Sequence, residues 1–220
     1  MSAPAIGVSP KNEVRKIRNE SAAATWQRVL SRGAGLALVC TLATSAFAEG
    51  PARFNDNGEL LLPQNYREWV MVGSQVTPNE QNNGKAPFTE TRIVYIDPEG
   101  YAHWKKTGEF RDGTMMVKEL VSVGSREGPG SGNGYFMGEY IGLEASVKDA
   151  KRFEKEPGNW AYYIFYVPDK PLVAAAKNFP TAECAACHEN AAKQDMVFTQ
   201  FYPVLRAAKG TGVSGVQLPK

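Results

Sequence analysis

The chain has 220 residues, of which 43% are hydrophobic and 22% charged, a balance that excludes disordered and fibrous proteins. Its three cysteines are too few for a disulfide scaffold. The formal net charge of +2 comes from the first 48 residues, which hold six basic and two acidic residues and leave 19 basic against 21 acidic residues in the rest. The remaining part is slightly acidic and has no basic surplus for binding nucleic acid.

The N-terminal region predicts a cleaved secretory signal peptide over residues 1–48. A basic stretch ends at Arg32, the apolar run 33–42 follows, and residues 46–48 form an A-x-A cleavage pattern. An apolar run of this length is about half of what spans a bilayer, so we expect no membrane span after cleavage. An amphipathic or buried helix is the alternative. We therefore expect a single domain over 49–220, located in the periplasm.

Taken in chain order, the rest of the sequence alternates short helices and loops with strands. A loop or short helix at 61–67 precedes an apolar stretch at 69–76 and a polar loop at 75–88. Runs rich in β-branched and aromatic residues predict four strands, at 91–96, 114–123, 135–145 and 159–167. A turn is expected at 97–100. Helical patterns are found at 101–106, 146–154, 172–177, 182–192 and 198–208.

The strongest motif is Cys184-Ala-Ala-Cys187-His188, the C-x-x-C-H pattern of c-type haem attachment. Its two thiols would bind the haem vinyl groups, and the imidazole of His188 would bind the iron. A redox C-x-x-C or half of a zinc site are the alternatives. Zinc needs two further ligands, and the mature chain offers only one more histidine, His103, and no further cysteine. An export signal upstream favours haem.

The position of this motif predicts the fold class. It lies near the C-terminus, behind a strand-rich middle, whereas small electron-carrier cytochromes are mostly helical and carry it near the N-terminus. Four-helix-bundle cytochromes with a C-terminal motif lack such strands. We therefore expect an α+β protein, in which an antiparallel β-sheet packs with helices and a C-terminal helix carries a c-type haem.

Four segments resemble the cytochrome P-460 family of ammonia-oxidising bacteria: LLPQNYREWVMVGSQVTPNE, FTETRIVYIDPEGYAHWKKTGEFRDGT, GPGSGNGYFMGEYIGLEAS and TAECAACHENAAKQDMVF. The resemblance covers nearly all of the mature chain. It implies a homodimer with a β-rich fold and one haem c per chain. It also implies oxidation of hydroxylamine to nitrous oxide or nitric oxide, and a covalent bond between a lysine and a meso carbon of the porphyrin.

Lys118 is the candidate for that bond. It lies inside a predicted strand and alternates with Met116 and Leu120 on one face. A lysine on a core strand is unusual, and burial would favour the neutral amine that attacks a macrocycle. The resemblance places Lys118 at the cross-linking position of the family. A solvated lysine on an edge strand is the alternative.

Glu144 is the candidate acid/base. By alternation it shares a strand face with Phe136, Gly138, Tyr140 and Gly142, and we expect the two glycines to leave room for a flat group such as haem. A carboxylate there could take protons from an N–O substrate. The resemblance implies this role for Glu144 as the distal acid/base. A solvated residue at the end of a strand is the alternative.

Arg92 is the third catalytic candidate, as a distal polar group or a partner for a haem propionate, with an exposed strand charge as the alternative. His103 is expected on the surface. Met196 follows His188 by eight residues and would lie on the proximal side of the iron, so we expect it to pack there and to leave the sixth position open. The aromatic residues of 159–167 are expected to form core and interface.

Three functions follow as hypotheses. The first is hydroxylamine oxidation at a five-coordinate haem iron, with electrons passed to a soluble cytochrome or another periplasmic acceptor. The second is a non-enzymatic gas-binding protein like the β-sheet cytochromes c′, which lack the lysine bond. The third is an electron carrier, which needs two strong axial ligands. Lys118 favours the first.

Overall fold

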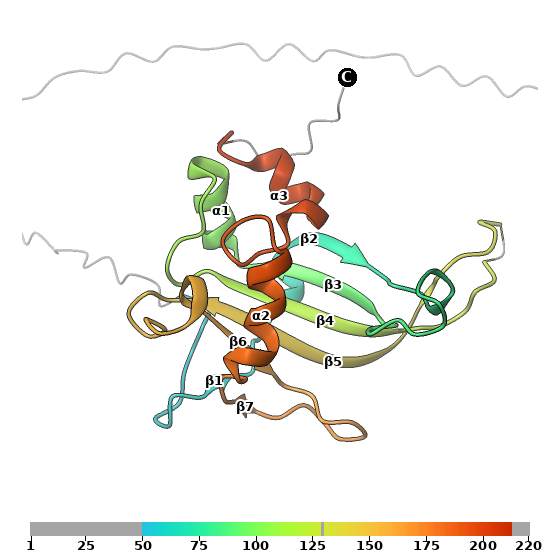
Figure 1. The fold of residues 1–220 in the computed structure, drawn as a ribbon, viewed down its shortest axis with the longest axis horizontal. Coiled ribbons are helices and arrows are strands. Elements are labelled where there is room, and N and C mark those ends of the chain that lie inside the picture. The colour runs from blue at the N-terminus through green and yellow to red at the C-terminus, as the bar shows by residue number, and fades with distance from the viewer. Residues whose placement is uncertain (1–49, 129, 213–220) are drawn as a thin grey trace, which may run out of the picture. The chain divides into compact units, whose positions relative to one another are not determined.

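The computed structural model describes residues 50–128 and 130–212, so the predicted signal peptide lies outside the described residues. Within them the chain forms a five-stranded and a two-stranded antiparallel sheet together with three α-helices (Figure 1). The expected α+β class with an antiparallel sheet is confirmed, with β-structure as the larger part.

The large sheet has the strand order β2-β3-β4-β5-β6, and every neighbouring pair is antiparallel. Its strands are β2 (Val70–Gln75), β3 (Thr91–Ile96), β4 (Met115–Val123), β5 (Met137–Lys148) and β6 (Trp160–Ile164). The small sheet pairs β1 (Leu60–Leu61) with β7 (Ala175–Ala176). The helices are α1 (Pro98–Thr107), α2 (Thr181–Ala191) and α3 (Pro203–Ala208).

The four predicted strands are present, but two of the predicted helices are wrong. Residues 146–148 continue β5, and the charged segment after them forms turns, in which the Asp149 side chain accepts the backbone N–H groups of Lys151 (3.0 Å) and Arg152 (2.9 Å). Such side-chain bonds compete with helix formation. The stretch 172–177 contains β7, which exists because it pairs with β1 across more than 100 residues of chain.

The turn expected at 97–100 is instead the start of α1. Asp97 is the N-cap residue, and Pro98 occupies the first helical position, which its fixed φ favours. The Asp97 carboxylate accepts the N–H groups of Gly100 and Met115, each at 2.8 Å. It therefore joins the first turn of α1 to the first residue of β4. Burial raises the pKa of this carboxyl group, although both bonds oppose the rise.

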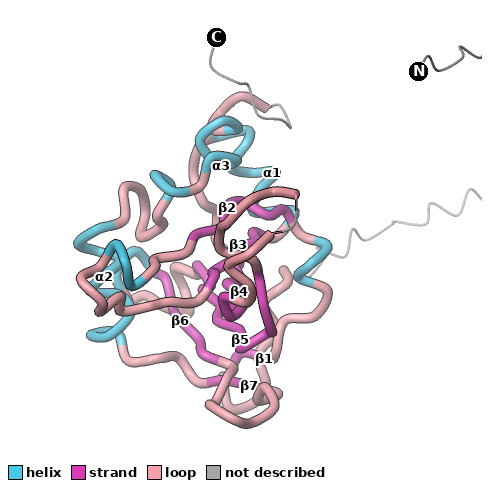
Figure 2. Tube along the Cα trace, turned by 90° about the vertical axis from the view of Figure 1, so that its right-hand side faces the viewer, coloured by secondary structure: helices cyan, strands magenta, loops and turns pink. Residues whose placement is uncertain are grey.

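The two faces of the large sheet are covered differently. We call the face that carries Val94, Lys118 and Glu144 the helix-covered face, because side chains from all three helices pack on it. The back face, which carries Val117 and Leu143, is closed by β1, β7 and the segments that flank them. Figure 2 shows α2 on one side of the strands of the large sheet. The described residues therefore form two hydrophobic cores, one on each face.

Two expectations for β5 are wrong: the position of Tyr140 beside Glu144 and the free space at Gly142. The register shifts so that Val121 pairs with Tyr140 while Leu120 pairs with Gly142. This β-bulge places Tyr140 on the back face and not beside Glu144. The expected room at Gly142 is also absent, because a Cβ atom there would lie 2.6 Å from the ring of Tyr166. The glycine accommodates an aromatic ring of this chain.

Candidate functional site

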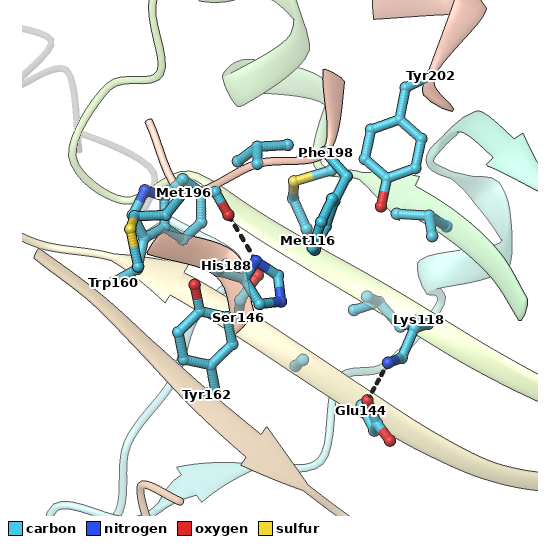
Figure 3. Close-up of a pocket in the computed structure, with 14 residues that line it drawn as sticks. Met116, Lys118, Glu144, Ser146, Trp160, Tyr162, His188, Met196, Phe198 and Tyr202 are labelled. Carbon is cyan, nitrogen blue, oxygen red and sulfur yellow. Dashed lines mark hydrogen bonds and ion pairs between the residues drawn. The ribbon is translucent and has the colours of Figure 1, made fainter. Parts of the chain in front are cut away.

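A pocket with a cavity volume of about 70 Å³ lies between α2 and the helix-covered face of the sheet. Figure 3 shows its side chains converging from the sheet, α2 and the segment after α2. Strands β4 and β5 contribute Lys118 and Glu144, β6 contributes Tyr162, and α2 contributes His188. The pocket thus contains three of the candidate residues from the sequence.

Lys118 and Glu144 are directly opposite each other in the register of β4 and β5. Cross-strand partners point to the same face, and the Lys118 ammonium forms an ion pair with the Glu144 carboxylate (Figure 3). Their side chains are 33% and 24% exposed, respectively. The strand pattern predicts that apolar neighbours enclose Lys118. The structure instead places its ammonium in the pocket, paired with the Glu144 carboxylate.

The orientation of His188 is fixed by a backbone carbonyl. Its Nδ1 lies 2.6 Å from the carbonyl oxygen of Met196, and since a carbonyl only accepts, Nδ1 carries the proton. The ring packs against Tyr162 and Phe198, with centroids 4.6 and 4.7 Å away. Burial lowers the pKa of His188 despite the hydrogen bond to the Met196 carbonyl, which opposes the change, and the Lys118 charge lowers it further. The imidazole is therefore neutral, with an unprotonated Nε2 that can bind a metal.

The two cysteines are free thiols on α2. Cys184 and His188 are four residues apart and Cys187 lies three residues after Cys184, so all three follow one stripe of the helix. Cys184 is half-buried against the core of the helix-covered face, whereas Cys187 is exposed. Burial raises the pKa of the Cys184 thiol, and the Glu144 charge adds to the rise. The thiol is therefore protonated at neutral pH.

This donor set fits haem c better than the alternatives. Two thiols and a neutral imidazole on one helix supply the two covalent attachment points and one axial nitrogen that haem c requires. Across 50–128 and 130–212, no group of three or more His, Cys, Asp and Glu side chains could hold a bare metal ion. A zinc site built from the Cys184 and Cys187 pair therefore lacks its further ligands.

Arg92 does not reach the pocket. It lies on the helix-covered face, where it pairs with Leu120, but it is not among the residues that line the pocket. Its guanidinium donates to Thr77 Oγ1 at 3.0 Å and lies 5.4 Å from the ring centroid of Phe88. His103 belongs to α1 and is also outside the pocket.

Several residues that line the pocket were not singled out from the sequence. Trp160 and Tyr162 belong to the aromatic segment expected to form core and interface. Both line the pocket, and the Tyr162 hydroxyl is buried without a hydrogen-bond partner in the described part of the chain. Met116 and Phe198 also line it. Alternation along β4 and β6 predicts which residues share a face of the sheet. It does not predict that Tyr162 of β6 lies opposite Ser146 of β5, because that contact depends on the register between the two strands.

The antiparallel sheet and the C-x-x-C-H helix that faces it fit the class of c-type cytochromes. Comparison with protein families matches residues 63–199 to Cytochrome P460. The match covers more than half of the chain, and the chain belongs to this family. A cytochrome family implies haem c as the cofactor. Comparison with curated proteins finds no match. Within the described residues, no helix combines the length and the apolar character needed to cross a membrane.

Proposed function

We propose that this chain is a haem c enzyme of the periplasm that oxidises hydroxylamine to nitrous oxide and nitric oxide. The observation that carries the proposal is the Lys118–Glu144 ion pair in the same pocket as His188. A gas-binding or electron-carrying cytochrome needs the axial histidine, but neither function needs a lysine and a carboxylate beside it. Belonging to the Cytochrome P460 family supports the proposal.

In this proposal the chain holds haem c through the thiols of Cys184 and Cys187 and through Nε2 of His188. When bound, the haem iron would accept electrons from an N–O substrate. The chain contributes orientation, because the carbonyl of Met196 fixes the plane and tautomer of His188. Apolar pocket residues such as Val94 and Phe198 exclude water around the site.

Lys118 and Glu144 would then divide two tasks. Lys118 Nζ is the proposed point of the bond to a porphyrin meso carbon. The new N–C bond would replace one N–H bond of the neutral amine and the meso C–H bond, with two protons released and two electrons taken by a periplasmic oxidant, and it would alter the electronic properties of the macrocycle. That bond would remove the ammonium charge that now pairs with Glu144. The freed carboxylate would take the protons that hydroxylamine loses during oxidation, as a general base in the pocket. Arg92 lies on the same face but outside the pocket, and its role as a distal group stays a prediction.

The partners of the reaction also belong to this proposal. Electrons would pass to a soluble cytochrome or another periplasmic acceptor, and the protein would act as a homodimer with one haem per chain. Exposed apolar side chains at the start of β5, such as Met137 and Ile141 at 62% and 45% exposure, are compatible with contact between copies.

The decisive experiment compares the wild type with Lys118→Leu after export and haem loading. We expect the wild type to show an absorption spectrum displaced from that of ordinary haem c, and to oxidise hydroxylamine. Lys118→Leu should show an ordinary c-type spectrum and lose turnover. Lys85→Leu, which changes an exposed lysine outside the pocket, should behave as the wild type. A Lys118→Leu protein with unchanged spectrum and turnover would contradict the proposal.

The gas-binding alternative gives a different outcome in the same experiment. It predicts an ordinary c-type spectrum for the wild type, tight binding of nitric oxide to the iron and no turnover of hydroxylamine. Tight binding of nitric oxide or cyanide would in turn count against a simple electron carrier, whose iron has both axial positions filled.

A further inference from the structure

A strained turn next to α2 holds the carbonyl that contacts His188. Residues 194–197 form a two-residue hairpin turn in which the Val197 N–H donates to the Gln194 carbonyl at 2.8 Å. Its central residues, Asp195 and Met196, have φ angles of 47° and 62°. Both lie in the left-handed region, as in type I′ turns, where glycine is preferred at the second central position. A methionine there is unfavourable and needs support from its surroundings.

The support comes first through the Asp195 carboxylate. Its Oδ1 accepts from Lys148 Nζ at 3.0 Å and from Trp160 Nε1 at 3.4 Å. Lys148 is the last residue of β5 and pairs with Trp160, the first residue of β6. The Lys148 ammonium also donates to the carbonyl of Gly158 at 2.7 Å. The side chains of Lys148 and Asp195 are 15% and 28% exposed, so solvent screens this pair only partly.

Two further contacts fix the same turn. Gln194 Nε2 donates to the Gly108 carbonyl at 2.7 Å, and Gln194 Oε1 accepts from Lys209 Nζ at 2.8 Å. On the other side, Gly158 allows close approach, since a Cβ atom there would lie 2.7 Å from Cγ of Met196. The turn is therefore anchored to the end of β5, to the residue after α1 and to the segment before β6.

We propose that Lys148 and Asp195 are positioning residues for the proximal histidine: their ion pair holds the strained Asp195–Met196 turn so that the Met196 carbonyl accepts the Nδ1 proton of His188. This inference rests on the proposed function, in which Nε2 of His188 binds the haem iron. A hydrogen bond to the far nitrogen raises the basicity of a metal-bound imidazole. A more basic ligand stabilises the ferric form and lowers the reduction potential.

The test uses the haem-loaded protein and two variants of one residue. Asp195→Gly keeps the left-handed backbone accessible but removes the anchoring carboxylate. Asp195→Asn retains a side-chain oxygen and also tolerates the left-handed region. We expect Asp195→Gly to raise the ferrous-to-ferric ratio at a fixed potential about tenfold, equivalent to 59 mV for one electron. The iron–histidine stretch in resonance Raman spectra should fall in frequency. Asp195→Asn should restore both values toward the wild type.

Lys148→Met provides a second variant with the same expected direction, because it removes the ammonium and keeps the stem beside Trp160. Glu80→Gln breaks an exposed ion pair with Arg126 away from the pocket and should leave the potential and the stretch unchanged. Urea unfolding of each variant reports stability separately. If Asp195→Gly and Lys148→Met load haem but keep the wild-type potential and stretch, the positioning role is wrong. A wild type without covalent haem would contradict the proposed function itself.

Discussion

Two adjacent residues of β4 carry charged pairs on opposite faces of the sheet, and the pairs differ in what they join. Lys118 pairs with Glu144 on the neighbouring strand, which the backbone ladder already holds in place. Glu119 pairs with Arg67, which lies in a segment outside the large sheet. The Arg67 pair therefore fastens a separate segment to the sheet, whereas the Lys118 pair adds little that the strand pairing does not provide.

The two ion pairs also differ in how deeply their carboxylates are buried. The Glu119 side chain is 6% exposed, and it also accepts a hydrogen bond from the Tyr95 hydroxyl at 3.4 Å. The guanidinium of Arg67 lies over the rings of Tyr66 and Tyr140, at 5.6 and 5.4 Å from their centroids. A buried carboxylate in such a cluster depends on its partners. The Arg67–Glu119 pair on the back face thus stabilises the fold, whereas the Lys118–Glu144 pair on the helix-covered face faces the pocket.

The largest expected effect tests the helix-covered face. Cys184→Ala combined with Cys187→Ala removes both thiols of α2 and should abolish covalent haem attachment completely, as measured by haem staining after denaturing electrophoresis and by mass spectrometry. His188→Ala should retain attachment but lose the axial nitrogen. Full covalent haem in the double variant would show that α2 is not the attachment site.

Glu144→Ala should lower hydroxylamine turnover by about 100-fold or more, the contribution typical of a positioned acid/base group. Haem content and unfolding free energy should stay near wild type, because the sheet register holds Lys118 and Glu144 without the ion pair. Glu139→Ala, which changes an exposed carboxylate on the same strand, is the matched control. Equal turnover in the two variants would remove Glu144 from the mechanism.

Asp97→Ala should destabilise the protein by about 2–4 kcal/mol, since an N-cap contributes about 1 kcal/mol and the buried Met115 N–H loses its acceptor at a cost of about 1–3 kcal/mol. Burial raises the pKa of Asp97 from its ordinary value of 3.8, so the folded state binds this proton more readily than the unfolded state. The associated stability is fully present below pH 3.8 and is lost as the pH rises through the raised pKa.

Urea unfolding at several pH values checks this prediction. The difference in unfolding free energy between the wild type and Asp97→Ala should be largest in acid and should shrink as the pH rises through the raised pKa. A difference that grows with rising pH would mean that the two backbone hydrogen bonds outweigh burial at this carboxylate.

The smallest expected effect tests the back face. Arg67→Ala leaves the buried Glu119 carboxylate, within the described part of the chain, with only the long hydrogen bond from Tyr95. This loss should cost about 1–3 kcal/mol of unfolding free energy. The haem spectrum and turnover should not change. Arg126→Ala, which breaks an exposed pair with Glu80, should give no resolvable loss of stability. A change in turnover in Arg67→Ala would mean that the two faces are coupled through β4.

Local sequence determined the C-x-x-C-H motif, the family and four of the five strands of the large sheet, because each depends on short spacings or on runs of residues with a common preference. Alternation along β4 also placed Lys118 on a face with Met116 and Leu120 and opposite to Glu119, and the register confirms that arrangement. The N-terminal motif that predicts a signal peptide is equally local, and it remains a prediction.

Only the tertiary structure decided how these elements meet. The pairing of Lys118 with Glu144 depends on a strand register across 26 positions of sequence, and the bulge that turns Tyr140 to the back face has no local marker. The same is true of β7, which forms only against β1. The contact between His188 and Met196 is made by a backbone carbonyl, which every residue carries. Long-range hydrogen bonds and packing fix these features, so the order of residues alone does not reveal them.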